Sequence, residues 1–126
     1  MKSERDEAIE DYIEDWYWDW DAESHKLAYQ TADFLFEFMD DLEENSGLAE
    51  NTKRKHFDNC WIIGSLICRV GDYSKFSLDI FSHPPFQLYE FTEKFWNTEY
   101  QVRAYNSTCN KLKKYTQKKM DLASKK

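Results

Sequence analysis

The sequence predicts an all-α fold: a single compact domain, spanning residues 1–126, of about five helices around an aromatic-rich core. With three Gly and two Pro, the chain has too few turn residues for an all-β protein. Apolar side chains recur at helical spacing along much of the chain. Aromatic residues make up 17% of the sequence, and each one that is buried removes about 150–250 Å² from water.

The N-terminal part predicts two amphipathic helices, an acidic one within residues 4–20, best marked over 7–20, and one over 24–45. At about 100° per residue, each apolar stripe occupies one side of its helix. The first stripe contains Ile9, Tyr12, Ile13, Trp16 and Trp20, and the second contains Leu27, Thr31, Phe34, Leu35, Phe38 and Leu42. One continuous helix of about 40 residues would be about 60 Å long. We therefore expect a break near residues 21–24, with Ser24 as the cap of the second helix.

A third helix is predicted over residues 51–70. Gly47 is placed to end the preceding helix in the left-handed conformation, and Asn51 or Thr52 could cap the new one. Between residues 60 and 68 the segment is apolar nearly all round, which is typical of a central helix.

Three side-chain positions of this helix carry specific expectations. Phe57 and Trp61 should be among the most buried residues of the domain. Gly64 costs about 1 kcal/mol relative to Ala in a helix interior, so it should mark a close approach to a neighbouring element.

The C-terminal part predicts two further helices, over residues 86–97 and 99–119. Residues 72–85 are less regular, and their apolar positions between 76 and 81 fit either a short helical turn or an extended stretch. The basic tail, residues 118–126, is expected to fray.

Signatures of catalysis are not found in this sequence. It contains no glycine-rich phosphate loop, no GxSxG and no HExxH motif. Cys60, Cys68 and Cys109 lie among apolar neighbours, where a thiol is protonated and inert. His56 and Cys60 have the spacing of two zinc ligands, but no second pair accompanies them. We therefore expect no catalytic residue, no metal, no cofactor and no enzymatic activity.

Charge is distributed unevenly along the chain. Residues 1–50 hold 17 acidic and 3 basic side chains, a net charge of −14, whereas residues 51–126 hold 7 acidic and 14 basic ones, a net charge of +7. Either an acidic layer packs beside a basic one, or the molecule has two surfaces of opposite charge.

Two binding functions follow from this asymmetry. The first is a protein-interaction module of the adaptor or inhibitor type, whose acidic first helix meets a protein partner or a second copy of the chain. Its candidate interface consists of Trp18, Asp11, Glu14 and Asp15, since Trp is enriched at binding hot spots. The alternative is a small nucleic-acid-binding domain, whose candidate phosphate contacts are Lys53, Arg54, Lys55, Lys111, Lys114 and Lys118.

A membrane partner is not expected, because no run of 18 apolar residues occurs. The N-terminus turns acidic at once and lacks the apolar run of a secretory signal. These features favour a cytoplasmic location.

The segment FLFEFM at 34–39, the turn GLAENT at 47–52 and the long helix that follows resemble the helical, SAM-like core-binding domain of phage-integrase-type tyrosine recombinases. In that family a helix ends at a Gly-Leu-Ser-x-Asn-Thr-like turn. The resemblance covers about residues 27–70 and implies a helical domain that clamps DNA beside a separate catalytic domain. The chain has no His-x-x-Arg motif and its first helix is acidic. The resemblance therefore supports the helical fold more than DNA binding, and it supports no recombinase activity.

Overall fold

The computed structural model describes residues 3–14, 16, 22–69, 75–81 and 99–124, and these residues form an all-α structure without strands. The helices are α1 (Glu4–Ile13), α2 (Ala22–Asn45), α3 (Glu50–Arg69) and α5 (Glu99–Ser124), with a 3₁₀ turn, η1 (Leu78–Phe81). The helix expected over 86–97 lies outside the described residues. Among the helices that are described, none is long and apolar enough to cross a bilayer.

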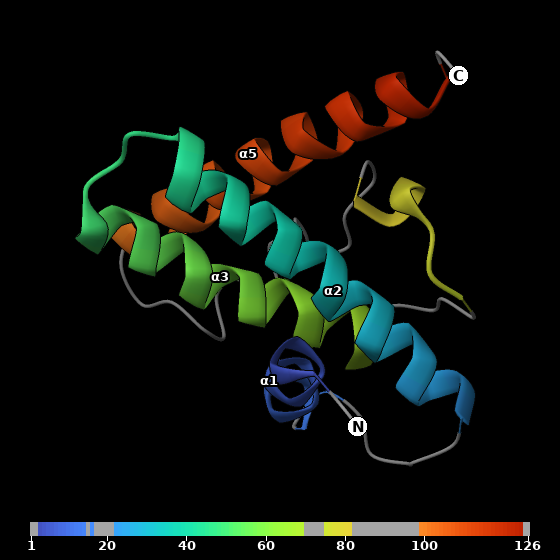
Figure 1. Ribbon diagram of the computed structural model, residues 1–126. Helices are drawn as coiled ribbons and strands as arrows, with labels where there is room; N and C mark the ends of the chain where they lie inside the picture. Colours follow the sequence, from blue (N-terminus) through green and yellow to red (C-terminus); the bar gives the residue numbers. More distant parts are fainter. Residues whose placement is uncertain (1–2, 15, 17–21, 70–74, 82–98, 125–126) are drawn as a thin grey trace.

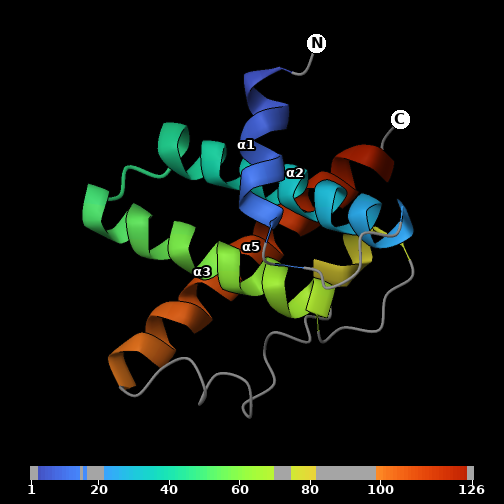
Figure 2. The ribbon, with the colours of Figure 1, turned by 90° about the horizontal axis from the view of Figure 1, so that it is seen from below.

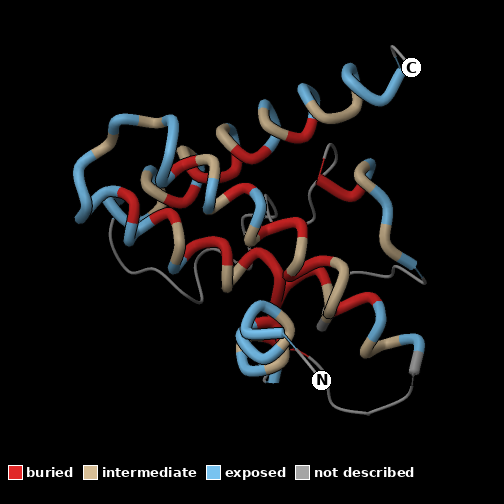
Figure 3. The backbone as a smooth tube through the Cα atoms, viewed as in Figure 1, coloured by how far each residue is buried: buried red, intermediate tan, exposed pale blue. Residues whose placement is uncertain are grey.

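The α2–α3 pair forms the middle of the molecule (Figures 1 and 2). The two helices run side by side in opposite directions, α1 crosses them on one side, and α5 crosses on the other side. The 3₁₀ turn η1 packs against α5. Buried residues follow the inner sides of the helices, whereas the last turn of α5 is exposed (Figure 3).

Helix α1 is shorter than the sequence predicts, because it ends at Ile13 rather than near residue 20. Its start is capped by Ser3, whose hydroxyl accepts from the Asp6 amide while the Asp6 carboxylate accepts from the Ser3 amide. Past its end, the Trp16 amide donates to the Ile13 carbonyl, 2.9 Å away, in a tighter turn. This turn leaves Trp16 fully buried, together with Ile9 and Ile13.

The stripe predicted for α2 is confirmed, since all six of its residues, Leu27 to Leu42, are buried. Residues 4–45 form two helices, as expected, but the break is not at residues 21–24: α1 already ends at Ile13 and α2 begins at Ala22. Ser24 therefore lies in the first turn of α2 and not at its cap. Gly47 adopts the left-handed conformation, with φ of 69°. In the same turn the Ser46 hydroxyl donates to the Leu42 carbonyl and accepts from the Leu48 amide.

Helix α3 lies between α2 and α5, as its apolar composition predicts. It begins at Glu50, so Asn51 and Thr52 belong to its first turn and do not cap it. The expectation that Phe57 and Trp61 are among the most buried residues is wrong, because both are only half-buried. In a helix that is apolar nearly all round, the sequence does not show which sides the neighbours cover.

Gly64 marks a close approach, as predicted. The ring of Trp16 lies directly against it, and a Cβ atom at this position would overlap the ring. Trp61 helps to hold the same region by donating from Nε1 to the Tyr12 carbonyl at 3.1 Å. The chain after α1 is therefore docked onto α3 through a contact that only glycine permits.

Helix α5 continues to Ser124, so the expected end at 119 and the frayed tail from 118 are wrong up to that residue. Its inner side buries Tyr105, Cys109 and Leu112. Tyr115 stacks against Phe34 and Phe38 of α2, with ring centres 5.7 and 5.5 Å apart. Aromatic clusters of this kind occur within a core whose other fully buried side chains are mainly aliphatic. The 3₁₀ turn at 78–81 decides the open alternative for residues 76–81 in favour of a short helical turn.

Candidate functional site

A buried polar cluster joins α3 to α5. The Thr108 hydroxyl donates to the Ala104 carbonyl at 3.1 Å, which uses its only proton. Its oxygen accepts from the Asn59 amide at 3.0 Å and lies 2.6 Å from His56 Nδ1. We assign Nδ1 as the donor of this short bond, with the hydroxyl proton directed at the Ala104 carbonyl. The neutral imidazole then carries its proton on Nδ1, and Nε2 is an acceptor.

The surroundings of His56 favour this neutral form. Burial lowers its pKa, and the positive charge of Lys111 lowers it further. The side chain is only 4% exposed, yet it lines a hollow between α3 and α5. His56 therefore lines a surface pocket while its Nδ1 is bound to Thr108.

This hollow, the His56 pocket, has a volume of about 410 Å³. Apart from Ala104, it is lined by Thr52, Lys55, His56, Tyr100, Arg103 and Ser107. Tyr100 is 56% exposed, which makes it one of two large hydrophobic side chains that stand open among the described residues. Lys55 Nζ contacts its hydroxyl and lies 4.2 Å from the ring centre. The ammonium thus holds the phenol at its hydroxyl end.

Tyr100 also borders a second hollow, in which Asp58 replaces the arginine. Three residues, Lys55, Tyr100 and Ala104, line both this hollow and the His56 pocket. The remaining lining of the second hollow is Asp58, Asn59, Ile62 and Gln101. Tyr100 therefore lines both a basic pocket and one that contains a carboxylate.

Further along α5 lies a third hollow, the lysine pocket, between α5 and the C-terminal half of α2. Its lining is Phe38, Asp41, Leu42, Lys111, Lys114, Tyr115 and Lys118. The apolar members Phe38 and Leu42 are buried, so the accessible side chains are mainly charged.

Both basic pockets use one side of α5. Its basic residues there, Arg103, Lys111, Lys114 and Lys118, are named the α5 stripe. Together with Tyr100 and Ser107 they fall within about an 80° arc, roughly opposite the buried Tyr105, Cys109 and Leu112. From Tyr100 to Lys118 the stripe extends about 27 Å along the helix. Among the described residues, none of its four bases forms an ion pair.

Acidic residues of α2 are engaged with other bases. Asp33 and Asp40 pair with Arg5 of α1, and Glu37 pairs with Lys119 at 3.8 Å. An acidic layer therefore packs partly beside basic residues, while the stripe keeps its own charge.

Of the six basic residues predicted for nucleic-acid binding, four line the pockets, Arg54 is exposed elsewhere, and Lys53 is buried. Lys55, Lys111, Lys114 and Lys118 border the two basic pockets. Arg54 is exposed on α3, but it lines neither pocket. Arg103 and Tyr100, which the sequence reasoning missed, lie at helical spacing from Lys111 and share the His56 pocket with Lys55; their spacing on the last helix was the available signal.

Lys53 is not an exposed surface base, contrary to the prediction from the sequence. It is 7% exposed, and its ammonium reaches the Glu43 carbonyl at 3.3 Å and the carboxylates of Glu43 and Glu50. Its aliphatic part is buried while its charge stays beside carboxylates at the surface. Lys53 therefore joins α3 to the end of α2 and contributes no free charge.

The acidic candidate interface is placed only in part. Asp11 and Glu14 are exposed, on the side of α1 away from Ile9 and Ile13. Asp15 and Trp18 lie outside the described residues. The described side chains of this face are thus acidic and open to solvent.

The cysteines are free thiols. Burial raises the pKa of Cys68 and of Cys109 to about 12 and that of Cys60 further, so all three are protonated near neutral pH. Within the described parts of the chain, no group of three or more His, Cys, Asp or Glu side chains is arranged to hold a metal ion.

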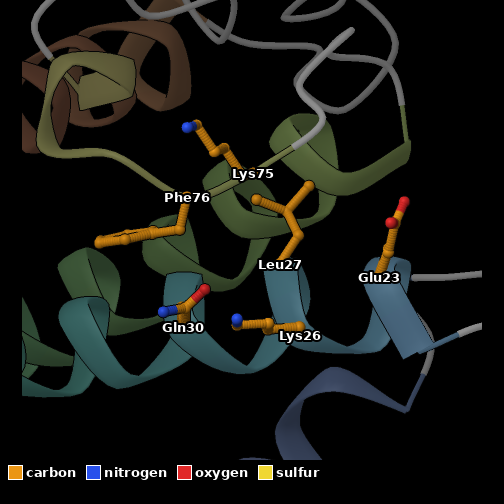
Figure 4. Close-up of a pocket in the computed structure, with 6 residues that line it drawn as sticks. All are labelled: Glu23, Lys26, Leu27, Gln30, Lys75 and Phe76. Carbon is orange, nitrogen blue, oxygen red and sulfur yellow. The ribbon is translucent and has the colours of Figure 1, made fainter.

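A last hollow lies between α2 and the segment before η1 (Figure 4). Its charged side chains, Glu23, Lys26 and Lys75, point apart from one another (Figure 4). Leu27 and Phe76 supply much of the remaining wall. These lining side chains do not indicate any one class of ligand.

Comparisons with protein-family models, curated proteins and solved structures give no match. The resemblance to recombinase core-binding domains therefore stays a prediction.

Proposed function

We propose that this protein is a non-enzymatic binding domain whose α5 stripe contacts the phosphates of a nucleic acid. The observation that carries the proposal is the gathering of four basic side chains along one side of α5, none of which forms an ion pair with a described residue. Lysine and arginine side chains that neutralise phosphates release condensed counterions, and this release drives most sequence-independent binding.

The composition of the stripe favours phosphates over a protein surface. Protein interfaces are enriched in aromatic residues, Met and Arg and depleted in Lys, particularly in their apolar centres. The stripe contains three Lys and one Arg. The apolar residues that line the lysine pocket with it, Phe38 and Leu42, are already buried in the core.

One carboxylate faces the proposed ligand. Asp41 lines the lysine pocket, where it accepts from the Asn45 amide at 2.9 Å. A negative charge at this edge repels phosphates, so Asp41→Asn should strengthen binding.

The test measures binding of fluorescein-labelled single-stranded and duplex DNA by fluorescence anisotropy, at salt concentrations from about 50 to 200 mM. Wild-type protein should bind, with affinity falling steeply as salt rises. A variant combining Lys111→Gln, Lys114→Gln and Lys118→Gln should reduce the salt slope by about 2–3, because each lost phosphate contact changes it by about 0.7 for single strands and 0.9 for duplex.

The matched control is Lys113→Gln. Lys113 is the immediate neighbour of Lys114, is exposed, and lies about 100° away from it around the helix. The Lys113→Gln substitution removes one positive charge outside the stripe, so it should leave the salt dependence of binding nearly unchanged. Absence of binding at about 50 mM salt, or equal effects of Lys113→Gln and Lys114→Gln, would contradict the proposal.

A protein-interaction module is the second candidate. It is supported by the exposed acidic side of α1, which carries Asp11 and Glu14 and has no base in its last turn. A partner would then be a basic protein surface. Chemical cross-linking in a native lysate should yield a protein adduct that Asp11→Lys with Glu14→Lys abolishes; an adduct insensitive to both changes would contradict this candidate.

A further inference from the structure

We propose that the His56 pocket is a subsite for an unpaired nucleobase, so that the nucleic acid bound along α5 is single-stranded. Tyr100 provides the stacking surface, His56 accepts a hydrogen bond from the edge of the base, and Arg103 with Lys55 holds the adjoining phosphates. This inference rests on the proposed nucleic-acid-binding function and adds the class of ligand.

Tyr100 has the exposure and the support that stacking needs. Tyr100 is 56% exposed in the first turn of α5 and lines two neighbouring hollows. Lys55 contacts the ring at its hydroxyl end, which fixes its direction before a ligand arrives. Aromatic side chains fixed beside a basic groove are the usual platforms for single-stranded nucleic acids.

His56 gives the pocket a polar floor. With Nδ1 assigned as the donor to Thr108, the neutral ring leaves Nε2 as an acceptor in a side chain that is more than nine-tenths buried. Among the described residues Nε2 has no hydrogen-bond partner. An N–H group on the edge of a base supplies the donor that this atom lacks.

Charge determines which of the two hollows beside Tyr100 accepts the nucleobase. The His56 pocket includes Arg103 and Lys55. The other basic side chains of the α5 stripe follow farther along the helix. The second hollow that Tyr100 lines includes Asp58, which repels phosphates. A strand with a base on the His56 side therefore keeps its backbone over positive charge.

Duplex DNA or RNA does not meet these requirements. A paired base has both faces covered by its neighbours in the stack, and extruding it costs a few kcal/mol. An unpaired strand presents its bases without that cost.

The experiment compares three probes of about 12 nucleotides, each labelled with fluorescein: a single-stranded DNA, the same length of abasic DNA, and a duplex. Full-length Tyr100→Leu should bind the base-bearing strand about 5- to 150-fold more weakly than wild type, as expected for loss of one stacked base. It should bind the abasic strand as wild type does. Tyr100→Phe keeps the ring but loses the hydroxyl that Lys55 contacts, so it should weaken binding of the base-bearing strand clearly less than Tyr100→Leu and leave binding of the abasic strand unchanged.

A second comparison tests the floor of the pocket. Oligonucleotides containing purine in place of adenine keep the ring system and lose the amine. They should bind about 2- to 10-fold more weakly than adenine strands, as expected for one lost hydrogen bond, and equal affinity would remove the hydrogen bond to His56 from the proposal.

Failure of the subsite and failure of the proposed function give different results. If all three probes bind with the salt dependence of the α5 stripe but Tyr100→Leu has no effect, or if the duplex binds more tightly, the base subsite is wrong and nucleic-acid binding stands. If no probe binds at about 50 mM salt, both are wrong.

Discussion

The two halves of α3 are built by opposite means. Its C-terminal half, around Gly64, is closed by Trp16 lying against bare backbone. Its N-terminal half contacts its neighbours through buried polar side chains, Lys53, His56 and Asn59. The first contact depends on shape alone, whereas the second depends on hydrogen bonds and leaves a hollow beside it.

This difference separates stability from binding. A close-packed apolar contact excludes water and offers no polar group to a ligand. A hydrogen-bonded cluster at the surface can leave one atom over for another molecule, as His56 does. We therefore expect substitutions near Gly64 to change mainly the free energy of unfolding, and substitutions near His56 to change both unfolding and binding.

The largest effect is expected at the apolar end. Trp16→Ala should lower the free energy of unfolding by about 3–5 kcal/mol, as removal of a buried aromatic ring does. Gly64→Ala should lower it by about 1–3 kcal/mol, since the new methyl group forces the Trp16 ring aside. Urea unfolding followed by circular dichroism measures both.

The double variant gives the control. Once Trp16 is replaced by Ala, the ring atoms nearest to the new methyl group are gone, and Gly64→Ala should stabilise the helix by up to about 1 kcal/mol. A Gly64→Ala effect with the same sign in both backgrounds would show that the ring contact does not limit this position.

At the polar end, Thr108→Val should cost about 2–4 kcal/mol. It keeps the shape of the side chain but leaves the buried donors of His56 and Asn59 without their acceptor. Thr108→Ser keeps the hydroxyl and should cost clearly less. If Val and Ser are equally destabilising in urea unfolding, the cluster contributes through packing and its hydrogen bonds matter little.

The smallest effect is a pH dependence. Burial lowers the pKa of His56 in the folded protein, whereas the unfolded chain protonates near the ordinary pKa of about 6.5. Below about pH 6.5 the unfolded state thus binds more protons, and stability falls as the pH falls. His56→Gln should lose less stability than wild type between about pH 7 and 5.5; parallel pH profiles of the urea midpoint would contradict this.

The sequence predicts features that depend on local spacing. The buried stripe from Leu27 to Leu42 follows from helical periodicity, and Gly47 follows from the need for a left-handed residue after a helix. Gly64 was interpretable because glycine within a helix is costly without a close neighbour, although the sequence did not identify that neighbour as Trp16.

Features that depend on distant partners were missed. His56 and Thr108 are 52 positions apart, so nothing local marks them as a pair. Lys53 looks like any surface lysine until the end of α2 is placed beside it. The α5 stripe lies between these cases, because its spacing was visible in the sequence but its relation to Lys55 was not.

The tight turn at Gly47 also has a kinetic consequence. Because α2 and α3 are joined by only a few residues, their contacts are local and can form early in folding. Helix α5 contacts α3 from much farther along the chain, and bringing these distant segments together costs entropy beforehand. The α2–α3 hairpin should therefore determine the folding rate, and the α5 contacts that carry the His56 pocket should determine how fast the protein unfolds.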